Sequence, residues 1–305
     1  MNDITPQFSV RDAGDGQIIV IIKGGVTDEA REFICNAQRV DSLIVGPGNI
    51  VDLDFLIDNK KKIQRLTVIA DVDGNVVSQL TYLKSLRIED VDCELDFKNL
   101  QELAYLDVYW NKRYEGKLKN LASIKALKIE AYKCESLSVF DKMSSLEYLM
   151  IHHSRKIESL DGISQFKRLR YLEISNCSKL VDIGELSECQ KFEGLFLAKC
   201  KSLVAYDAIA KIKKLEELTL SGKFDNLSWV RGLKYLRHLR LECSLDDGDL
   251  GFLYEMEALQ LALFNNKRNF SVKISDVQRY LEAKGFDQKT LRLEGIRFPG
   301  AWDYN

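Results

Sequence analysis

Leucine, isoleucine and valine recur along most of this chain in a short three-point pattern. An apolar residue is followed after two others by a leucine, and after one more by Leu, Ile or Val. One copy comprises Leu169, Leu172 and Ile174, and Leu195 and Leu197 repeat it twenty-three residues later. Because alternate residues of a β-strand point to opposite faces, each copy predicts a short strand with one apolar face.

The pattern occurs eleven times between about residues 40 and 264, with central leucines 20 to 23 residues apart. These central leucines are Leu43, Leu66, Leu86, Leu106, Leu127, Leu149, Leu172, Leu195, Leu218, Leu239 and Leu259. One repeat cannot bury its apolar strand face or the apolar residues of the segment that returns from it, such as Leu180, Ile183 and Leu186. Stacked repeats bury both sets as a continuous core, so we expect parallel strands that lie side by side.

The pattern resembles that of the leucine-rich repeat family, whose repeat has 20–29 residues and reads L-x-x-L-x-L-x-x-N/C-x-L. The resemblance covers about residues 40–264, and the repeats are similar to internalin-like and phosphatase-regulator-like ones. It implies an α/β fold, a leucine-rich repeat solenoid with a curved parallel β-sheet on its concave side and a helical or irregular convex side. The inward Asn/Cys position of the family is held here by Asn111, Cys177 and Cys200, with Ser154 and Ser244 as small polar substitutes. We therefore expect both cysteines to be buried structural thiols.

The two ends of the chain depart from the repeat, as capping units do. Residues 1–39 contain the apolar run Ile18–Ile22 and then Thr27, which can N-cap a helix, so we expect a cap of one strand and one helix. Residues 265–305 form the other cap, in which Ser275 and Gln278 fit a capping box and a helix is expected to end near Gly285. Residues 290–295 read as a last strand. The tail after them has aromatic residues that could cover the last repeat or dock to a partner: Phe298, Trp302 and Tyr304.

Charge, cysteine content and hydropathy set the expected class of protein. There are 44 basic and 46 acidic residues, and this balance does not favour nucleic-acid binding. Seven cysteines without paired spacing do not indicate a disulfide framework. We find no secretory signal and no apolar run of the ~18 residues that a membrane span needs. We expect a soluble, reduced, cytoplasmic protein that is monomeric on its own and binds neither nucleic acid nor membranes.

Catalytic and cofactor motifs are absent from the sequence. It has no P-loop and no C-x-x-C motif, and its three histidines at 152, 153 and 238 do not predict a catalytic or metal-binding set. We therefore expect no enzyme activity, no cofactor and no metal. An enzyme or enzyme subunit that uses a reactive thiol or His152 and His153 is the alternative. Burial of every cysteine, with histidines that lack acidic partners, would argue against that alternative.

The strand residues between the leucines are expected to point onto the concave face, where large side chains gather in repeats four to eight. Exposed aromatic residues and methionine are enriched in the hot spots of protein interfaces. With strands ~4.8 Å apart, five strands span about 19 Å, which is long enough for an interface. The predicted partner-binding residues are Tyr105, Asp107, Tyr109, Trp110, Lys128, Tyr148, Met150, His152, Tyr171, Glu173 and Phe196.

The sequence therefore predicts a non-catalytic module that holds a protein partner on its concave sheet. An adaptor, a secreted effector and an immunity protein that neutralises a toxin would all use this mechanism, and the sequence does not separate them. A small-ligand or carbohydrate sensor that uses the tyrosine-rich concave face is a further alternative.

Overall fold

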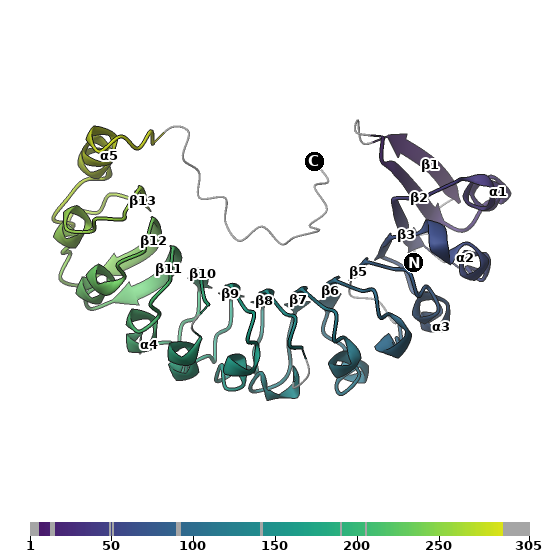
Figure 1. Cartoon of the computed structure of the whole chain (residues 1–305), viewed down its shortest axis with the longest axis horizontal. Coiled ribbons are helices and arrows are strands. Elements are labelled where there is room, and N and C mark those ends of the chain that lie inside the picture. The colour runs from purple at the N-terminus through teal and green to yellow at the C-terminus, as the bar shows by residue number, and fades with distance from the viewer. Residues whose placement is uncertain are drawn as a thin grey trace. The chain divides into compact units, whose positions relative to one another are not determined.

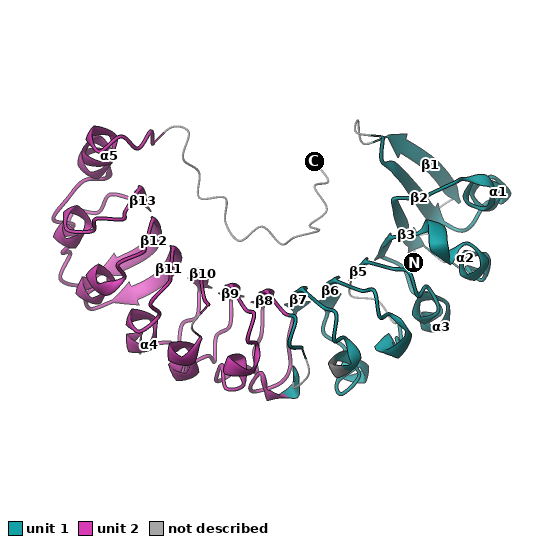
Figure 2. Cartoon of the chain, in the orientation of Figure 1, with its two compact units in different colours: residues 1–130, 139–145, 302–305 teal, residues 131–138, 146–301 magenta. Residues whose placement is uncertain are grey.

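The computed structural model describes residues 6–12, 16–48, 50, 52–89, 93–140, 143–189, 191–204 and 206–288. The chain divides into two compact units (Figure 2). Unit 1 comprises Met1–Glu130, Val139–Ser145 and Trp302–Asn305, and unit 2 comprises Ala131–Ser138 and Leu146–Ala301. The strand expected at residues 290–295 and the aromatic residues Phe298, Trp302 and Tyr304 lie outside the described residues. No helix among the described residues is both long and apolar enough to cross a membrane.

Unit 1 contains strands whose order in the sheet follows the chain (Figure 1). They are β1 (Gln7–Asp12), β2 (Ile18–Gly24), β3 (Ser42–Gly48), β4 (Arg65–Val68), β5 (Ser85–Ile88), β6 (Tyr105–Tyr109) and β7 (Ala126–Glu130). Strands β1 and β2 are antiparallel, and each later strand of the unit pairs in parallel with the one before it. The helices are α1 (Asp28–Asn36), α2 (Phe55–Asp58) and α3 (Gly74–Ser78), and 3-10 turns include Lys60–Lys62, Phe97–Asn99, Lys112–Tyr114 and Leu118–Asn120.

Unit 2 has the same architecture, with parallel strands. They are β8 (Tyr148–His152), β9 (Tyr171–Ser175), β10 (Gly194–Ala198), β11 (Glu217–Phe224), β12 (His238–Leu245) and β13 (Leu261–Phe264). The return segments contain α4 (Asp207–Ala210) and the 3-10 turns Ile163–Gln165, Gly184–Glu188, Ser228–Gly232 and Gly251–Tyr254, and α5 (Ile274–Ala283) follows β13. The tight hydrogen bonding of 3-10 turns suits a return segment in so short a repeat.

The predicted leucines form the core. In unit 2 the strand register aligns Leu149, Leu172, Leu195, Leu218 and Leu239 in one buried row. The return-segment residues expected to face them are also buried: Leu180, Ile183 and Leu186. Each repeat thus covers the apolar surface of its neighbours, as the sequence pattern predicts.

The phase predicted for the last repeat is wrong. Ala262 pairs with Leu239 and Phe264 with Leu241, so the strand begins three residues later than Leu259 and Leu261 would place it. In the observed phase Leu259 takes the first position of the pattern, Ala262 stands where the central leucine is expected, and Phe264 takes the last position. Pairing with β12 selects this later phase, which places the larger Phe264 side chain in the core.

Both caps contain the expected helices. The first cap has an additional strand, and the helix of the second cap begins earlier than expected. Thr27 Oγ1 accepts a hydrogen bond of 3.1 Å from the Ala30 amide, which confirms the N-cap of α1. The first cap has two strands, not one, because β1 forms a hairpin with β2. The capping box at Ser275 is wrong, since α5 already begins at Ile274 and the Ile274 amide donates to Asn266 Oδ1 at 2.8 Å. The helix ends as expected before Gly285, which has a φ of 94°.

A recurring turn follows four consecutive strands. The residue directly after each of β7, β8, β9 and β10 is in the left-handed region, with φ of 55° or 56°. These residues are Ala131, His153, Asn176 and Lys199. Asparagine tolerates this conformation better than other side chains that have a Cβ atom, so the other three carry local backbone strain.

Candidate functional site

The candidate site lies on the open face of the sheet, which we define as the face opposite the buried leucine rows. The predicted residues fall into two groups that belong to different units, and all of them except Trp110 occupy strand positions of this face. Strands β8, β9 and β10 of unit 2 carry Tyr148, Met150, His152, Tyr171, Glu173 and Phe196. Strands β6 and β7 of unit 1 carry Tyr105, Asp107, Tyr109 and Lys128, and Trp110 follows directly after β6.

Two tyrosines of unit 2 form a stacked pair. Tyr148 and Tyr171 are register partners on β8 and β9, and their ring centroids lie 4.9 Å apart with the planes 8° from parallel. Gly194 is the next residue in the same row. A Cβ atom at Gly194 would come within 2.5 Å of Tyr171 Cδ1, so the ring occupies space that only a glycine leaves open. Burial raises the pKa of Tyr171 to about 12, and its phenol is therefore neutral at physiological pH.

An ion pair fixes the other side of Tyr171. Arg170 Nε lies 2.8 Å from Glu193 Oε1, and Arg170 Nη2 lies 2.5 Å from Glu193 Oε2. The Tyr171 hydroxyl donates to the same Oε2 at 3.3 Å, and the Arg170 guanidinium carbon lies 5.5 Å from the Tyr171 ring centroid. Hydrogen bonding to Arg170 lowers the pKa of Glu193. Stacking, the hydroxyl bond and Gly194 together hold the ring in one place.

Beside the tyrosine pair lies a polar contact between two predicted residues. His152 Nε2 lies 2.8 Å from Glu173 Oε1. Phe196 pairs in register with Glu173 and is half-buried. The structure therefore brings aromatic, acidic and imidazole groups together on three adjacent strands of unit 2.

The group in unit 1 is more polar. Asp107 Oδ2 lies 3.4 Å from Lys128 Nζ and 3.7 Å from Arg87 Nε, and Lys128 lies 3.7 Å from Glu130. Burial raises the pKa of Asp107 even though both cations act to lower it. Tyr105 is half-buried beside this network, whereas Tyr109 is 36% exposed.

Two of the predicted residues are not exposed. Trp110 is 3% exposed because it continues the inward alternation of Leu106 and Val108 beyond the end of β6. Met150 is 4% exposed and pairs in register with Glu173. It lies in the central row of the open face, where the rows of side chains on either side cover it. The expectation that these two side chains stand on the surface is wrong.

The cysteines at the family position are structural, as predicted. Cys177 is buried, and its Sγ lies 3.4 Å from the Ser175 carbonyl oxygen and 3.8 Å from that of Ile151. Cys200 contacts the equivalent carbonyl oxygens, those of Ala198 at 3.6 Å and Ile174 at 3.9 Å. In the preceding repeat the buried Ser154 hydroxyl donates to the Tyr132 carbonyl oxygen and accepts from the Ile157 amide, and the Asn111 side chain accepts from the Arg113 amide.

Two findings would argue against an enzyme: burial of every cysteine, and histidines that lack acidic partners. Neither is observed. Cys35 is exposed, and Cys134 and Cys189 are partly exposed. His152 contacts Glu173, and His238 Nδ1 lies 3.4 Å from Glu217 Oε1. Within the described part of the chain, no three His, Cys, Asp or Glu residues come together as a metal-binding group.

The structure adds a pocket that sequence reasoning missed. It has a volume of about 530 Å³ and lies at the edge of the sheet where strands β8 to β11 begin. We call it the rim pocket, and it is lined by Glu147, Arg168, Arg170, Lys191, Glu193 and Lys214. Its signal in the sequence is a basic residue directly before the first apolar residue of three successive repeats.

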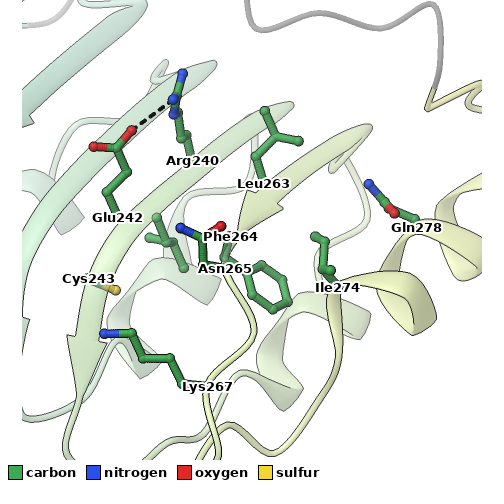
Figure 3. Close-up of a pocket in the computed structure, with 10 residues that line it drawn as sticks. Arg240, Glu242, Cys243, Leu263, Phe264, Asn265, Lys267, Ile274 and Gln278 are labelled. Carbon is green, nitrogen blue, oxygen red and sulfur yellow. Dashed lines mark ion pairs between the residues drawn. The ribbon is translucent and has the colours of Figure 1, made fainter.

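A second pocket of about 590 Å³ lies between β12, β13 and the start of α5 (Figure 3). Arg240 and Glu242 form an ion pair of 2.8 Å at one side, and Gln278 of α5 lies at the other. Phe264 and Ile274 supply apolar surface. None of the predicted site residues lines this pocket.

The fold that these repeats build is a leucine-rich repeat solenoid. The structures that it resembles include an internalin, InlF, of Listeria monocytogenes strain 4b F2365, with a TM-score of 0.56, 16% identity and coverage of 82% of this chain and 87% of that one. They also include the functional domain of InlJ of Listeria monocytogenes, which includes a cysteine ladder, with a TM-score of 0.54 and 17% identity. That match covers 77% of this chain and 49% of the InlJ chain. No family model matches the sequence, and no curated protein matches it.

Proposed function

We propose that this chain is a non-catalytic binding module that holds a protein partner on the open face of its sheet, the concave side of such a solenoid. The binding surface is centred on Tyr148 and Tyr171, with His152, Glu173 and Phe196 around them. The observation that carries the proposal is the stacked tyrosine pair, whose rings lie 4.9 Å apart on adjacent strands.

This pair is suited to binding because it is held in position before a partner arrives. Tyr171 is fixed by Tyr148, by Glu193 and by the space above Gly194. A side chain that is already ordered loses little conformational entropy on association. Tyrosine also presents a large apolar ring with a polar hydroxyl group, which is why it is enriched in interface hot spots.

Unit 1 by itself carries further candidate contact residues. Tyr105 and Tyr109 supply aromatic contacts, and Asp107 and Lys128 supply charge. Trp110 packs on the core side of the sheet, and Met150 is covered within the central row of the open face, so both are buried. Their role in binding is therefore indirect.

The module works in the cytoplasm as a monomer that becomes part of a complex when its partner is present. The exposed thiol of Cys35 supports a reducing compartment. An adaptor, an effector and an immunity protein would each use the same preformed surface, and the identity of the partner distinguishes them.

The test is capture of partners from a lysate of the source cells with the wild-type chain and with Tyr148→Ala/Tyr171→Ala. We expect one protein bound in stoichiometric amount by the wild type and lost in the variant, with an affinity lowered by ~1–3 kcal/mol for each tyrosine. Val181→Ala, which removes an exposed side chain of a return segment, is the matched control and should bind normally. Equal capture by all three proteins would refute the tyrosine-centred surface.

A further inference from the structure

The rim pocket lies directly beside the stacked tyrosines. Arg170 and Glu193 line this pocket, and the same two side chains contact Tyr171. Glu147 and Arg170 immediately precede Tyr148 and Tyr171 in the chain. Any partner that covers the tyrosine pair therefore reaches the edge of this pocket.

The pocket carries an excess of positive charge. Arg170 and Glu193 neutralise each other through two hydrogen bonds. Three other cations that line the pocket are exposed and have no ion pair among the described residues: Arg168, Lys191 and Lys214. Besides Glu193, the acidic lining residue is Glu147. Lys214 is near enough to Glu193 to help lower its pKa. Three cations that have no carboxylate partner of their own thus border the proposed binding surface.

These three cations are arranged in a line. Arg168, Lys191 and Lys214 precede β9, β10 and β11, one in each successive repeat. Neighbouring strands are ~4.8 Å apart, so the line covers about 10 Å. An extended peptide of about four residues covers the same distance at ~3.3 Å per residue.

We propose that the rim pocket binds an acidic segment of the protein partner, whose Asp or Glu carboxylates pair with Arg168, Lys191 and Lys214. This inference rests on the proposed function and names the chemistry of the partner at one edge of the surface. Carboxylates fit better than a phosphate group because the cations are spread along an edge. The carboxylates of Glu147 and Glu193 would in addition repel a doubly charged phosphate at close range.

The first test uses a fluorescein-labelled hexaglutamate peptide and measures its anisotropy with the wild-type chain. We expect binding that weakens as NaCl rises from 50 to 300 mM, because exposed charges are screened over shorter distances at higher salt. Arg168→Gln/Lys191→Gln/Lys214→Gln should weaken the binding at least tenfold at low salt. A matched variant removes three exposed lysines of the turns that follow β7, β8 and β10, Lys133→Gln/Lys156→Gln/Lys201→Gln, and should change the binding less than twofold.

Three results would overturn the proposal. They are equal weakening in both triple variants, equal binding of a hexaglutamine peptide, and full displacement of hexaglutamate by 5 mM inorganic phosphate. The last result would identify a phosphate site. Thermal unfolding of both triple variants confirms that each is folded before its binding is compared.

The same variants separate this inference from the proposed function once the partner has been captured. Loss of the partner with Tyr148→Ala/Tyr171→Ala but full binding by the rim variant would leave the tyrosine surface standing and refute the acidic segment. Full binding by the tyrosine variant with loss in the rim variant would refute the tyrosine centre and support the rim. We expect both variants to bind the partner more weakly than the wild type, and the remaining binding of the rim variant to depend less on salt.

Discussion

The ring of Tyr171 lies against the backbone of Gly194, so closely that a Cβ atom at position 194 would come within 2.5 Å of Tyr171 Cδ1. The two residues are register partners on β9 and β10. The missing side chain of Gly194 therefore decides where the ring lies, and through the ring it decides the geometry of the stack with Tyr148.

Gly194→Ala should push the Tyr171 ring out of this stack. We expect the free energy of unfolding to fall by about 1 kcal/mol, the lower end of the cost of overpacking, because the ring is only half-buried. In a Tyr171→Ala background the same substitution should cost almost nothing, since the clash is gone. Urea unfolding of the wild type, both single variants and the double variant measures this coupling. Additive effects would show that the clash does not exist in solution.

The buried leucine rows should respond differently from the tyrosines. Leu172→Ala removes a buried side chain from the aligned row and should lower the free energy of unfolding by ~2–5 kcal/mol. Val181→Ala, at an exposed position, should change it by less than about 0.5 kcal/mol. Chemical denaturation of the three proteins makes the comparison. A Leu172→Ala protein as stable as the wild type would contradict the stacked core.

The repeat made most of this fold predictable from the sequence, because a three-point apolar pattern in phase over many copies has one way to bury itself. Leu172 and Leu195 were placed correctly on that ground. The last repeat was not, because Ala262 and Phe264 replace the expected residues in the phase that pairing with β12 selects, whereas Leu259 and Leu261 fit the pattern in the wrong phase. The start of α5 was misplaced because a distant residue caps the helix. The acceptor for the Ile274 amide is Asn266, eight residues earlier in the chain.

The site was less predictable than the fold. Alternation identified Tyr148 and Tyr171 as neighbours on one face, but the stacking of their rings depends on Gly194 in the next repeat. The burial of Trp110 could have been expected, since alternation from Val108 points it inward. The rim pocket was missed because Arg168, Lys191 and Lys214 each look like an ordinary surface cation, and only the parallel register brings them to one edge.

The ion pair of Glu193 with Arg170 should make stability depend on pH. The pKa of Glu193 is lower in the folded protein than its ordinary value of 4.5, so the pair stabilises the fold above that pH and the stabilisation is lost as the pH falls. Glu193→Gln should therefore cost up to about 1 kcal/mol at pH 7, as for other partly exposed ion pairs. The difference from the wild type should shrink below pH 4.5.

Urea unfolding at pH 7, 5 and 3.5 tests this dependence on Glu193. The matched control is Glu188→Gln, which removes an exposed carboxylate that has no ion pair among the described residues and should give no pH-dependent difference. A constant difference between the wild type and Glu193→Gln at all three pH values would show that the side chain acts through packing and not through charge.

The left-handed turns after the strands should be open to stabilisation. Lys199 has a φ of 55°, which a lysine adopts at a cost of roughly 1–2 kcal/mol and a glycine adopts freely. Lys199→Gly should raise the free energy of unfolding by about 0.5–1 kcal/mol, because the relief of strain exceeds the added entropy of the unfolded chain. Lys201→Gly, two residues later and not in the left-handed region, should lower it by a similar amount. Thermal and urea unfolding of both variants distinguishes them, and a loss of stability in Lys199→Gly would show that the turn is not strained.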